Sequence, residues 1–123
     1  MSAHVLVILS GSGVYDGSEI HEAVIALVAL SAAGAKVTCA APNKPQLHVI
    51  NHATGEVMDE ERNVMVESAR ISRGNIVDLA TIGDEGFDAV FLPGGFGAAK
   101  NLCTFAVDGP SCTIDPDVNR VLN

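Results

Sequence analysis

Basic residues are scarce in this chain. Only seven of its 123 residues are Lys or Arg, against fifteen Asp or Glu, and the formal net charge at pH 7 is -8. The few basic residues are scattered along the sequence, whereas nucleic acids and anionic membranes attract clustered Lys and Arg. We therefore expect neither a nucleic acid nor a membrane surface as a partner.

Long apolar runs and paired cysteines are also lacking. No apolar run approaches the roughly 20 residues that span a bilayer, and residues 1–11 show neither a basic leader nor a cleavage site. The three cysteines, Cys39, Cys103 and Cys112, form no CxxC pair. Their odd number fits reduced thiols better than a disulfide framework or a zinc site. These absences predict a soluble, cytoplasmic protein without a signal peptide.

The residues that are present predict one α/β domain. Hydrophobic residues make up 48% of the chain and charged residues 18%, which is too apolar for a disordered protein. Continuous aliphatic and β-branched runs at residues 4–10, 36–41 and 87–92 are typical of strands buried on both faces of a parallel sheet. Pro42 closes the second run, and residues 93–95 break the third.

Helical patterns separate these strands. Asp16, with Glu19 three residues later, resembles an N-cap and opens a helix that ends before Gly34. Its expected apolar stripe consists of Ile20, Val24, Leu27 and Val28. A second helical face follows at residues 62–73, after a polar excursion at 42–60. The resulting right-handed β-α-β unit predicts a doubly wound α/β fold with a parallel sheet.

Residues 115–123, the last segment, indicate how much of a domain the chain contains. Asp115 and Pro116 suit the N-cap and first position of a helix, but its apolar stripe has barely begun at Asn123. Three strands would leave sheet edges and helix faces uncovered, which small soluble domains normally avoid. We therefore expect residues 1–123 to form a single, apparently truncated domain, or to require a partner.

Two glycine-rich loops could carry chemistry. Residues 10–17 have the spacing GxGxxxG, a loose match to a dinucleotide-binding loop, but the second strand ends without the Asp or Glu that would bind a ribose. A structural glycine turn is favoured there. Residues 93–97 follow a strand, so their amides could hold an oxyanion or simply form a tight turn; the local pattern leaves both open.

Isolated ionisable residues have mostly structural interpretations. Glu19 and Glu22 lie in the first turn of a helix, where capping or solvation is favoured on local grounds. His21, His48 and His52 show no firm metal spacing beyond the loose His48–His52 pair, so surface or hydrogen-bonding roles are favoured. Cys103 follows the glycine turn without the strand-turn-helix geometry of a nucleophile, which favours a core cysteine.

Four stretches together resemble a known family. They are SGSGVYDGSEIHE at residues 10–22, NHATG at 51–55, RNV at 62–64 with ESARI at 67–71, and PGGFGAAKNL at 93–102. The pattern resembles the isoprenoid-biosynthesis-associated, amidotransferase-like glyoxalase family of the class I glutamine-amidotransferase-like superfamily. That family is similar to the parkinsonism-associated deglycase and the intracellular-protease-like proteins.

The resemblance implies a flavodoxin-like three-layer sandwich with a parallel sheet, of which residues 1–123 would be the N-terminal part of a single amidotransferase-like domain. It also implies a cysteine on a nucleophile elbow, and dimers that need no cofactor. It assigns Glu22 as the carboxyl group that contacts the nucleophilic thiol, and Gly94 and Gly95 as the donors of the oxyanion site. The implied reaction converts glyoxal or methylglyoxal into a hydroxy acid.

The family's cysteine lies on a later strand and is followed by Ile-Ala-Pro, a pattern that none of Cys39, Cys103 and Cys112 matches. We therefore expect the complete family member to act as a glyoxalase and this chain to be inactive. The alternative is a non-catalytic binding or oligomeric protein. Nothing in these residues specifies the glutamine or peptide site of the amidotransferase or protease-like relatives.

Overall fold

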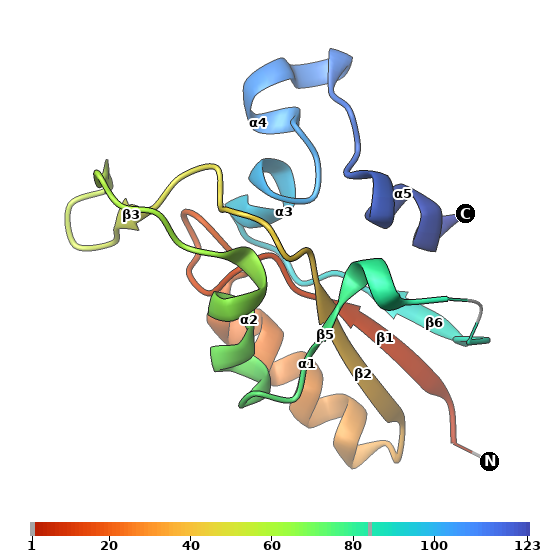
Figure 1. Cartoon of the computed structure of the whole chain (residues 1–123). Coiled ribbons are helices and arrows are strands. Elements are labelled where there is room, and N and C mark those ends of the chain that lie inside the picture. The colour runs from red at the N-terminus through yellow and green to blue at the C-terminus, as the bar shows by residue number, and fades with distance from the viewer. Residues whose placement is uncertain (1, 84) are drawn as a thin grey trace.

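The computed structural model describes residues 2–83 and 85–123. The elements in chain order are β1 (His4–Ile8), α1 (Ile20–Ala32), β2 (Lys36–Ala41), β3 (Ile50–Asn51), β4 (Glu56–Val57), α2 (Val64–Ser72), β5 (Val77–Asp78), the 3-10 turn η1 (Leu79–Thr81), β6 (Ala89–Phe91), α3 (Phe96–Lys100), α4 (Phe105–Asp108), the 3-10 turn η2 (Gly109–Ser111) and α5 (Pro116–Leu122). Strands β5, β2, β1 and β6 form one parallel sheet in that order, while β3 and β4 form a separate antiparallel hairpin (Figure 1).

The central strand β1 divides the core into two. Val5, Val7 and Leu9 pack in a cluster with Ala23 of α1 and Val64 of α2. The intervening Leu6 and Ile8 belong to a second cluster, with Leu79, Leu102 and Val118 on the other face. Because successive side chains of a strand point to opposite faces, a continuous apolar run is what a sheet covered on both sides requires. The predicted flavodoxin-like α/β sandwich with a parallel sheet is confirmed.

The start of α1 differs from the prediction. Glu19, and not Asp16, is the N-cap: its carboxylate accepts hydrogen bonds of 3.0 Å from the backbone N–H groups of His21 and Glu22. The hydrogen bond from the His21 side chain has the largest effect in lowering the pKa of Glu19, and the hydrogen bonds from the two backbone N–H groups lower it further. Asp16 is buried, because the glycine-rich loop turns it inward to accept a 2.8 Å hydrogen bond from the backbone N–H of Ile50.

The expected apolar stripe of α1 is only partly buried. Leu27 packs against the core as predicted, but Ile20 and Val28 are 42% and 63% exposed. The helix meets the sheet through the small, fully buried side chain of Ala23, so its contact face is rotated away from Ile20 and Val28. The stripe prediction is therefore wrong for those two residues and for Val24.

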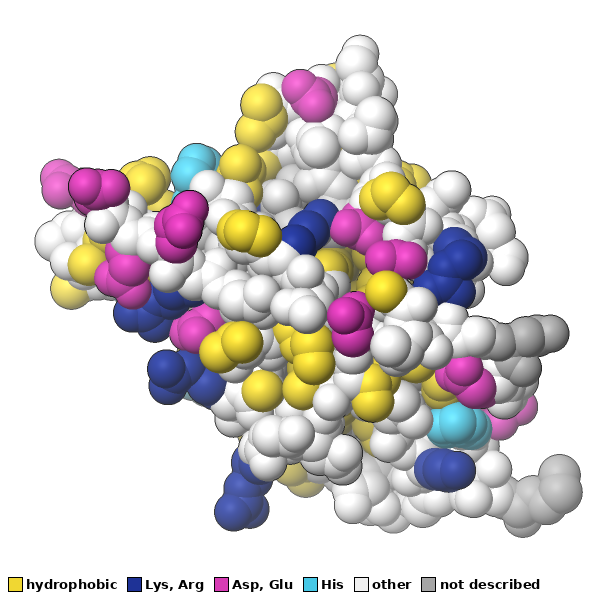
Figure 2. All heavy atoms as spheres, viewed as in Figure 1, with side chains coloured by type: hydrophobic (Ala, Val, Ile, Leu, Met, Phe, Trp, Pro, Cys, Tyr) yellow, Lys and Arg dark blue, Asp and Glu magenta, His cyan; other side chains and the backbone are white. Residues whose placement is uncertain are grey.

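The other elements follow the sequence more closely. Helix α2 lies within the predicted range 62–73, capped by the side chain of Asn63, which accepts from the Val66 N–H at 3.0 Å. Asp115 caps α5 as predicted, and its carboxylate also accepts a 2.6 Å hydrogen bond from Lys44. None of the helices in the described residues has the length and apolar character needed to cross a bilayer. On the face drawn in Figure 2, Lys and Arg side chains lie dispersed among the carboxylates.

Candidate functional site

Two glycine-rich loops meet beyond the carboxyl ends of β1 and β6. Residues 10–18 follow β1 and residues 93–97 follow β6. Backbone hydrogen bonds join the loops directly, from Glu19 N–H to Gly94 O at 2.7 Å and from Phe96 N–H to Val14 O at 2.8 Å. In parallel α/β sheets this end of the strands is where ligands bind. Both glycine motifs therefore lie together at the end of the sheet where a ligand-binding site is expected.

Gly95 makes the close approach possible. It is the N-cap of α3 and has a φ of 117°, which L side chains rarely adopt. A Cβ at this position would collide with the backbone of residues 17–19, and one at Gly97 would collide with Gly17. The turn at 93–97 is therefore held against the first loop by direct backbone contact.

Glu22 lies against Gly94. A Cβ built on Gly94 would be 2.5 Å from Oε1 of Glu22, so the carboxyl group lies directly over this residue. Neither Gly94 nor Gly95 donates its backbone N–H to an acceptor in residues 2–83 or 85–123. The three residues predicted as a site therefore lie together: an exposed carboxyl group beside two free amide donors. Glu19, by contrast, is occupied in capping α1.

The three cysteines lie in other parts of the fold. Cys39 belongs to the core cluster beneath α1 and α2, and burial raises the pKa of its thiol. The half-buried Cys103 donates to the carbonyl oxygen of Ala98 at 3.5 Å, consistent with the predicted structural role. Cys112 follows η2 and is also half-buried.

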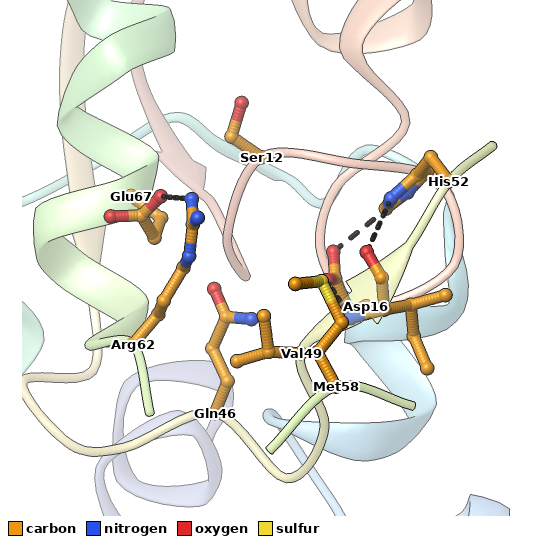
Figure 3. A pocket seen from close by; sticks show the side chains of 9 residues that line it. Ser12, Asp16, Gln46, Val49, His52, Met58, Arg62 and Glu67 are labelled. Atoms are coloured by element: carbon orange, nitrogen blue, oxygen red, sulfur yellow. Dashed lines mark hydrogen bonds and ion pairs between the residues drawn. The ribbon is translucent and has the colours of Figure 1, made fainter. Parts of the chain in front are cut away.

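A small cavity of about 100 Å³ lies on the other side of the first glycine loop. Its lining residues are Ser12, Asp16, Gln46, Val49, Ile50, His52, Met58, Arg62 and Glu67, as Figure 3 shows. Arg62 donates to Glu67 at 3.1 Å, and Nε2 of His52 is 3.9 Å from Oδ1 of Asp16. His52 also bonds to Ile50 O and accepts from Tyr15 N–H, so its predicted hydrogen-bonding role is confirmed. Among the described residues no group of three His, Cys, Asp or Glu could hold a metal.

Asn101 is the residue near these loops that the sequence did not reveal. It is 2% exposed, and its amide nitrogen donates to Ser10 O at 2.8 Å and to Asp16 O at 2.9 Å. Its oxygen accepts from the Leu47 N–H at 2.9 Å. Asn101 thus ties the end of α3 to the first glycine loop and to the segment before the hairpin. The available signal was an Asn between Lys100 and Leu102, at the end of the helix predicted after the glycine turn.

Known proteins resemble this chain throughout. No family model matches it. The glutamine amidotransferase-like class 1 domain-containing protein 3, mitochondrial, of Homo sapiens is 57% identical over 122 residues, covering 98% of this chain and 46% of that protein. A crystal structure of an isoprenoid biosynthesis protein with an amidotransferase-like domain from Ehrlichia chaffeensis has a TM-score of 0.90 at 40% identity, covering 98% of this chain and 55% of the other. The predicted resemblance to the class I glutamine amidotransferase-like superfamily is thus confirmed over 98% of this chain.

Other relatives within the superfamily overturn one prediction. The ES1 protein homolog, mitochondrial, of Rattus norvegicus is 57% identical over 121 residues, and the ES1 protein, mitochondrial, of Danio rerio is 41% identical over 126. These names and that of the human relative contradict the predicted cytoplasmic location. That prediction relied on the lack of a basic leader in residues 1–11 and on reduced cysteines. Reduced cysteines argue against an oxidising compartment but do not distinguish one reducing compartment from another.

The chain spans about half the length of the curated relatives it matches, 46% of the human and rat proteins and 47% of the zebrafish protein. The confirmed resemblance therefore concerns this segment and its fold. The activity of a whole superfamily member is a matter for proposal.

Proposed function

We propose that this chain supplies the acid and oxyanion half of a cofactor-independent glyoxalase, which converts glyoxal or methylglyoxal into the hydroxy acid. The observation that carries the proposal is the Glu22 carboxyl group lying over Gly94, beside two backbone amides with no acceptor in the described chain. Preorganised amide donors stabilise a developing oxyanion, and an adjacent carboxyl group can move protons. The proposal places the thiolate on a segment outside these 123 residues.

The chemistry needs no oxidant. The thiolate adds to the aldehyde carbon of methylglyoxal, and the amides of Gly94 and Gly95 hold the resulting alkoxide. Glu22 then transfers the proton from that carbon to its neighbour through an enediol, which gives a thioester of the hydroxy acid. Water hydrolyses the thioester and releases the thiol, so methylglyoxal and one water become lactate. A carboxyl group hydrogen-bonded to the thiolate also favours the charged, nucleophilic form.

A chimera tests this proposal. In it, the chain replaces the 122 aligned residues of the human relative. We expect the chimera, treated with a chelator and free of glutathione, to form lactate from methylglyoxal, whereas the chain alone forms none above the buffer rate. Lactate is measured by chromatography, and folding of both proteins is verified by circular dichroism.

Two variants assign the activity to this site. Glu22→Gln should lower kcat by about 10²-fold, the lower end of the effect of a general acid–base group. Glu19→Gln is the matched control, because Glu19 lies in the same turn but caps the helix, and its rate should be unchanged. A folded chimera that forms no lactate, or one in which Glu22→Gln has no effect, would contradict the proposal.

A second candidate function, association with another copy of the chain, is favoured by the sheet edge. Among the described strands β6 pairs only with β1, and Phe91 and Leu92 at its end are 41% and 37% exposed. An open edge with apolar side chains is a surface on which strands pair between molecules. Light scattering should then give about twice the 12.7 kDa mass of one chain. A monomer at all concentrations would exclude this association.

A further inference from the structure

The carboxylate of Asp16, in the wall of the small cavity beside the first glycine loop, is buried without a counter-charge. Its side chain is 8% exposed, and Oδ2 accepts a 2.8 Å hydrogen bond from the Ile50 N–H. Oδ1 accepts no hydrogen bond from residues 2–83 or 85–123, and the one ion-pair contact there is with Nε2 of His52, at 3.9 Å. Buried charges in proteins are nearly always paired, so this one requires an explanation.

His52 does not supply the missing charge. Its Nδ1 lies 3.0 Å from the carbonyl oxygen of Ile50, which can only accept a hydrogen bond, so Nδ1 carries a proton. Its Nε2 accepts a 3.2 Å hydrogen bond from the Tyr15 N–H, so this nitrogen carries none. The imidazole ring is therefore neutral, and Nε2 has no N–H group to donate to Asp16.

Arg62 does not supply the charge either. Arg62 and Glu67 lie across the cavity from Asp16, as Figure 3 shows. Arg62 donates to Glu60 and, at 3.1 Å, to Glu67, and Glu67 also accepts from Arg70 at 3.2 Å. Each of these side chains thus has a partner of opposite charge. Among the described residues of the cavity wall, Asp16 is the charged one that is not neutralised.

Two further oxygen atoms of the cavity wall have no partner within residues 2–83 and 85–123. The amide nitrogen of Gln46 donates to the His48 carbonyl oxygen at 3.0 Å, which leaves Oε1 unbonded. This oxygen lies beside the glycine loop, because a Cβ built on Gly11 would be 3.1 Å from it. The second is the hydroxyl oxygen of Ser12, which also lines the cavity. An occupant that satisfies both oxygens and Asp16 must donate hydrogen bonds.

The size of the cavity limits the occupant. A volume of about 100 Å³ has room for about three water molecules. Water would satisfy the oxygen atoms but would not neutralise the carboxylate. No group of three His, Cys, Asp or Glu in the described part of the chain could hold a metal ion. A small cation that carries N–H groups meets both requirements.

We propose that this cavity binds a small primary amine in its ammonium form, held by Asp16, Gln46 and Ser12. A primary ammonium group has three N–H donors, one for each of Oδ1, Oε1 and Oγ of these residues. A hydrogen bond between an ammonium group and a carboxylate is among the strongest in proteins. The site is independent of the proposed glyoxalase function, because it shares no residue with the Glu22–Gly94 site.

Binding is measured by a ¹H–¹⁵N chemical-shift titration of the full chain with methylammonium chloride at constant ionic strength. We expect saturable shifts centred on the amides of Ile50 and Tyr15, which donate to Asp16 and His52. Tetramethylammonium and K⁺ carry the same charge without N–H donors, so they should bind at least tenfold more weakly. No saturable shift with methylammonium, or equal affinity for either control cation, would overturn the proposal.

Variants of the cavity wall assign the binding to these residues. Asp16→Asn removes the charge but keeps an oxygen for the Ile50 N–H, and it should weaken binding at least tenfold. Ser12→Ala breaks no hydrogen bond of the described chain, so it should fold normally and bind at least threefold more weakly. Asp59→Asn is the matched control, because Asp59 is exposed and does not line the cavity; its affinity should be unchanged. Unchanged affinity in Ser12→Ala, or in folded Asp16→Asn, would contradict the assignment.

The protonation of His52 is a separate test. A long-range ¹H–¹⁵N spectrum of the free chain at neutral pH should show a neutral ring with its proton on Nδ1. A doubly protonated ring would mean that His52 itself neutralises Asp16, and the proposal would then be wrong.

Discussion

Replacing Gly95 by Ala is expected to lower the free energy of unfolding by about 3 kcal/mol. Two effects add at this position. The φ of 117° is unfavourable for any L side chain, and the new Cβ would collide with Gly17 O and Glu19 N. These are backbone atoms held by their own hydrogen bonds, so neither can move aside cheaply. Urea denaturation followed by circular dichroism measures the change.

Gly55→Ala is the control for Gly95→Ala. Gly55 has a φ of 81°, but a Cβ there would meet no atom within 4 Å. This variant therefore reports conformational strain alone, about 1 kcal/mol. Equal losses of stability in the two variants would show that the backbone contact between the glycine loops is looser than the structure indicates.

Asn101→Ala is expected to lower the free energy of unfolding by about 3 kcal/mol. The substitution removes three hydrogen bonds and leaves the carbonyl groups of Ser10 and Asp16 without this donor. An unsatisfied buried polar group costs roughly 1–3 kcal/mol. The measurement is the urea midpoint and slope, with native-state hydrogen exchange of the Leu47 amide as a local probe.

Two variants accompany Asn101→Ala. Asn101→Asp retains the size of the side chain but replaces its donor with an acceptor, so it should be at least as destabilising. Asn75→Ala changes an exposed asparagine whose side chain forms no hydrogen bond within residues 2–83 and 85–123, so it should alter stability by no more than about 0.5 kcal/mol. A small effect of both substitutions at position 101 would mean that Asn101 does not hold the loops together.

The buried strands and the glycine loops could be predicted because each is determined by local sequence. Residues 4–10 and 36–41 are apolar on both faces, and a parallel sheet is where such runs are stable. The approach of Glu22 to Gly94 could not be read from spacing, because 72 positions separate them and only the crossing of the loops brings them together. The resemblance to a family, rather than any local pattern, indicated that pair.

The sequence was less informative about features that are determined by tertiary packing. The two strands of the β3–β4 hairpin have two residues each, too few for a recognisable alternation. Asp16 has the pattern of an N-cap, but a buried hydrogen bond to Ile50 outweighs that local preference. The exposure of Val28 depends on which side of α1 meets the sheet, and Ala23, a small residue with little hydrophobic signal, determines that side.

The direct contact between the two glycine loops has a consequence for how such a site can change during evolution. The amides of Gly94 and Gly95 are positioned by main-chain atoms, so their geometry does not depend on the identity of the surrounding side chains. Exposed neighbours such as Tyr15 and Phe96 can vary without displacing these donors. In the proposed glyoxalase, new substrate preferences would therefore arise by point substitution around an unaltered pair of hydrogen-bond donors.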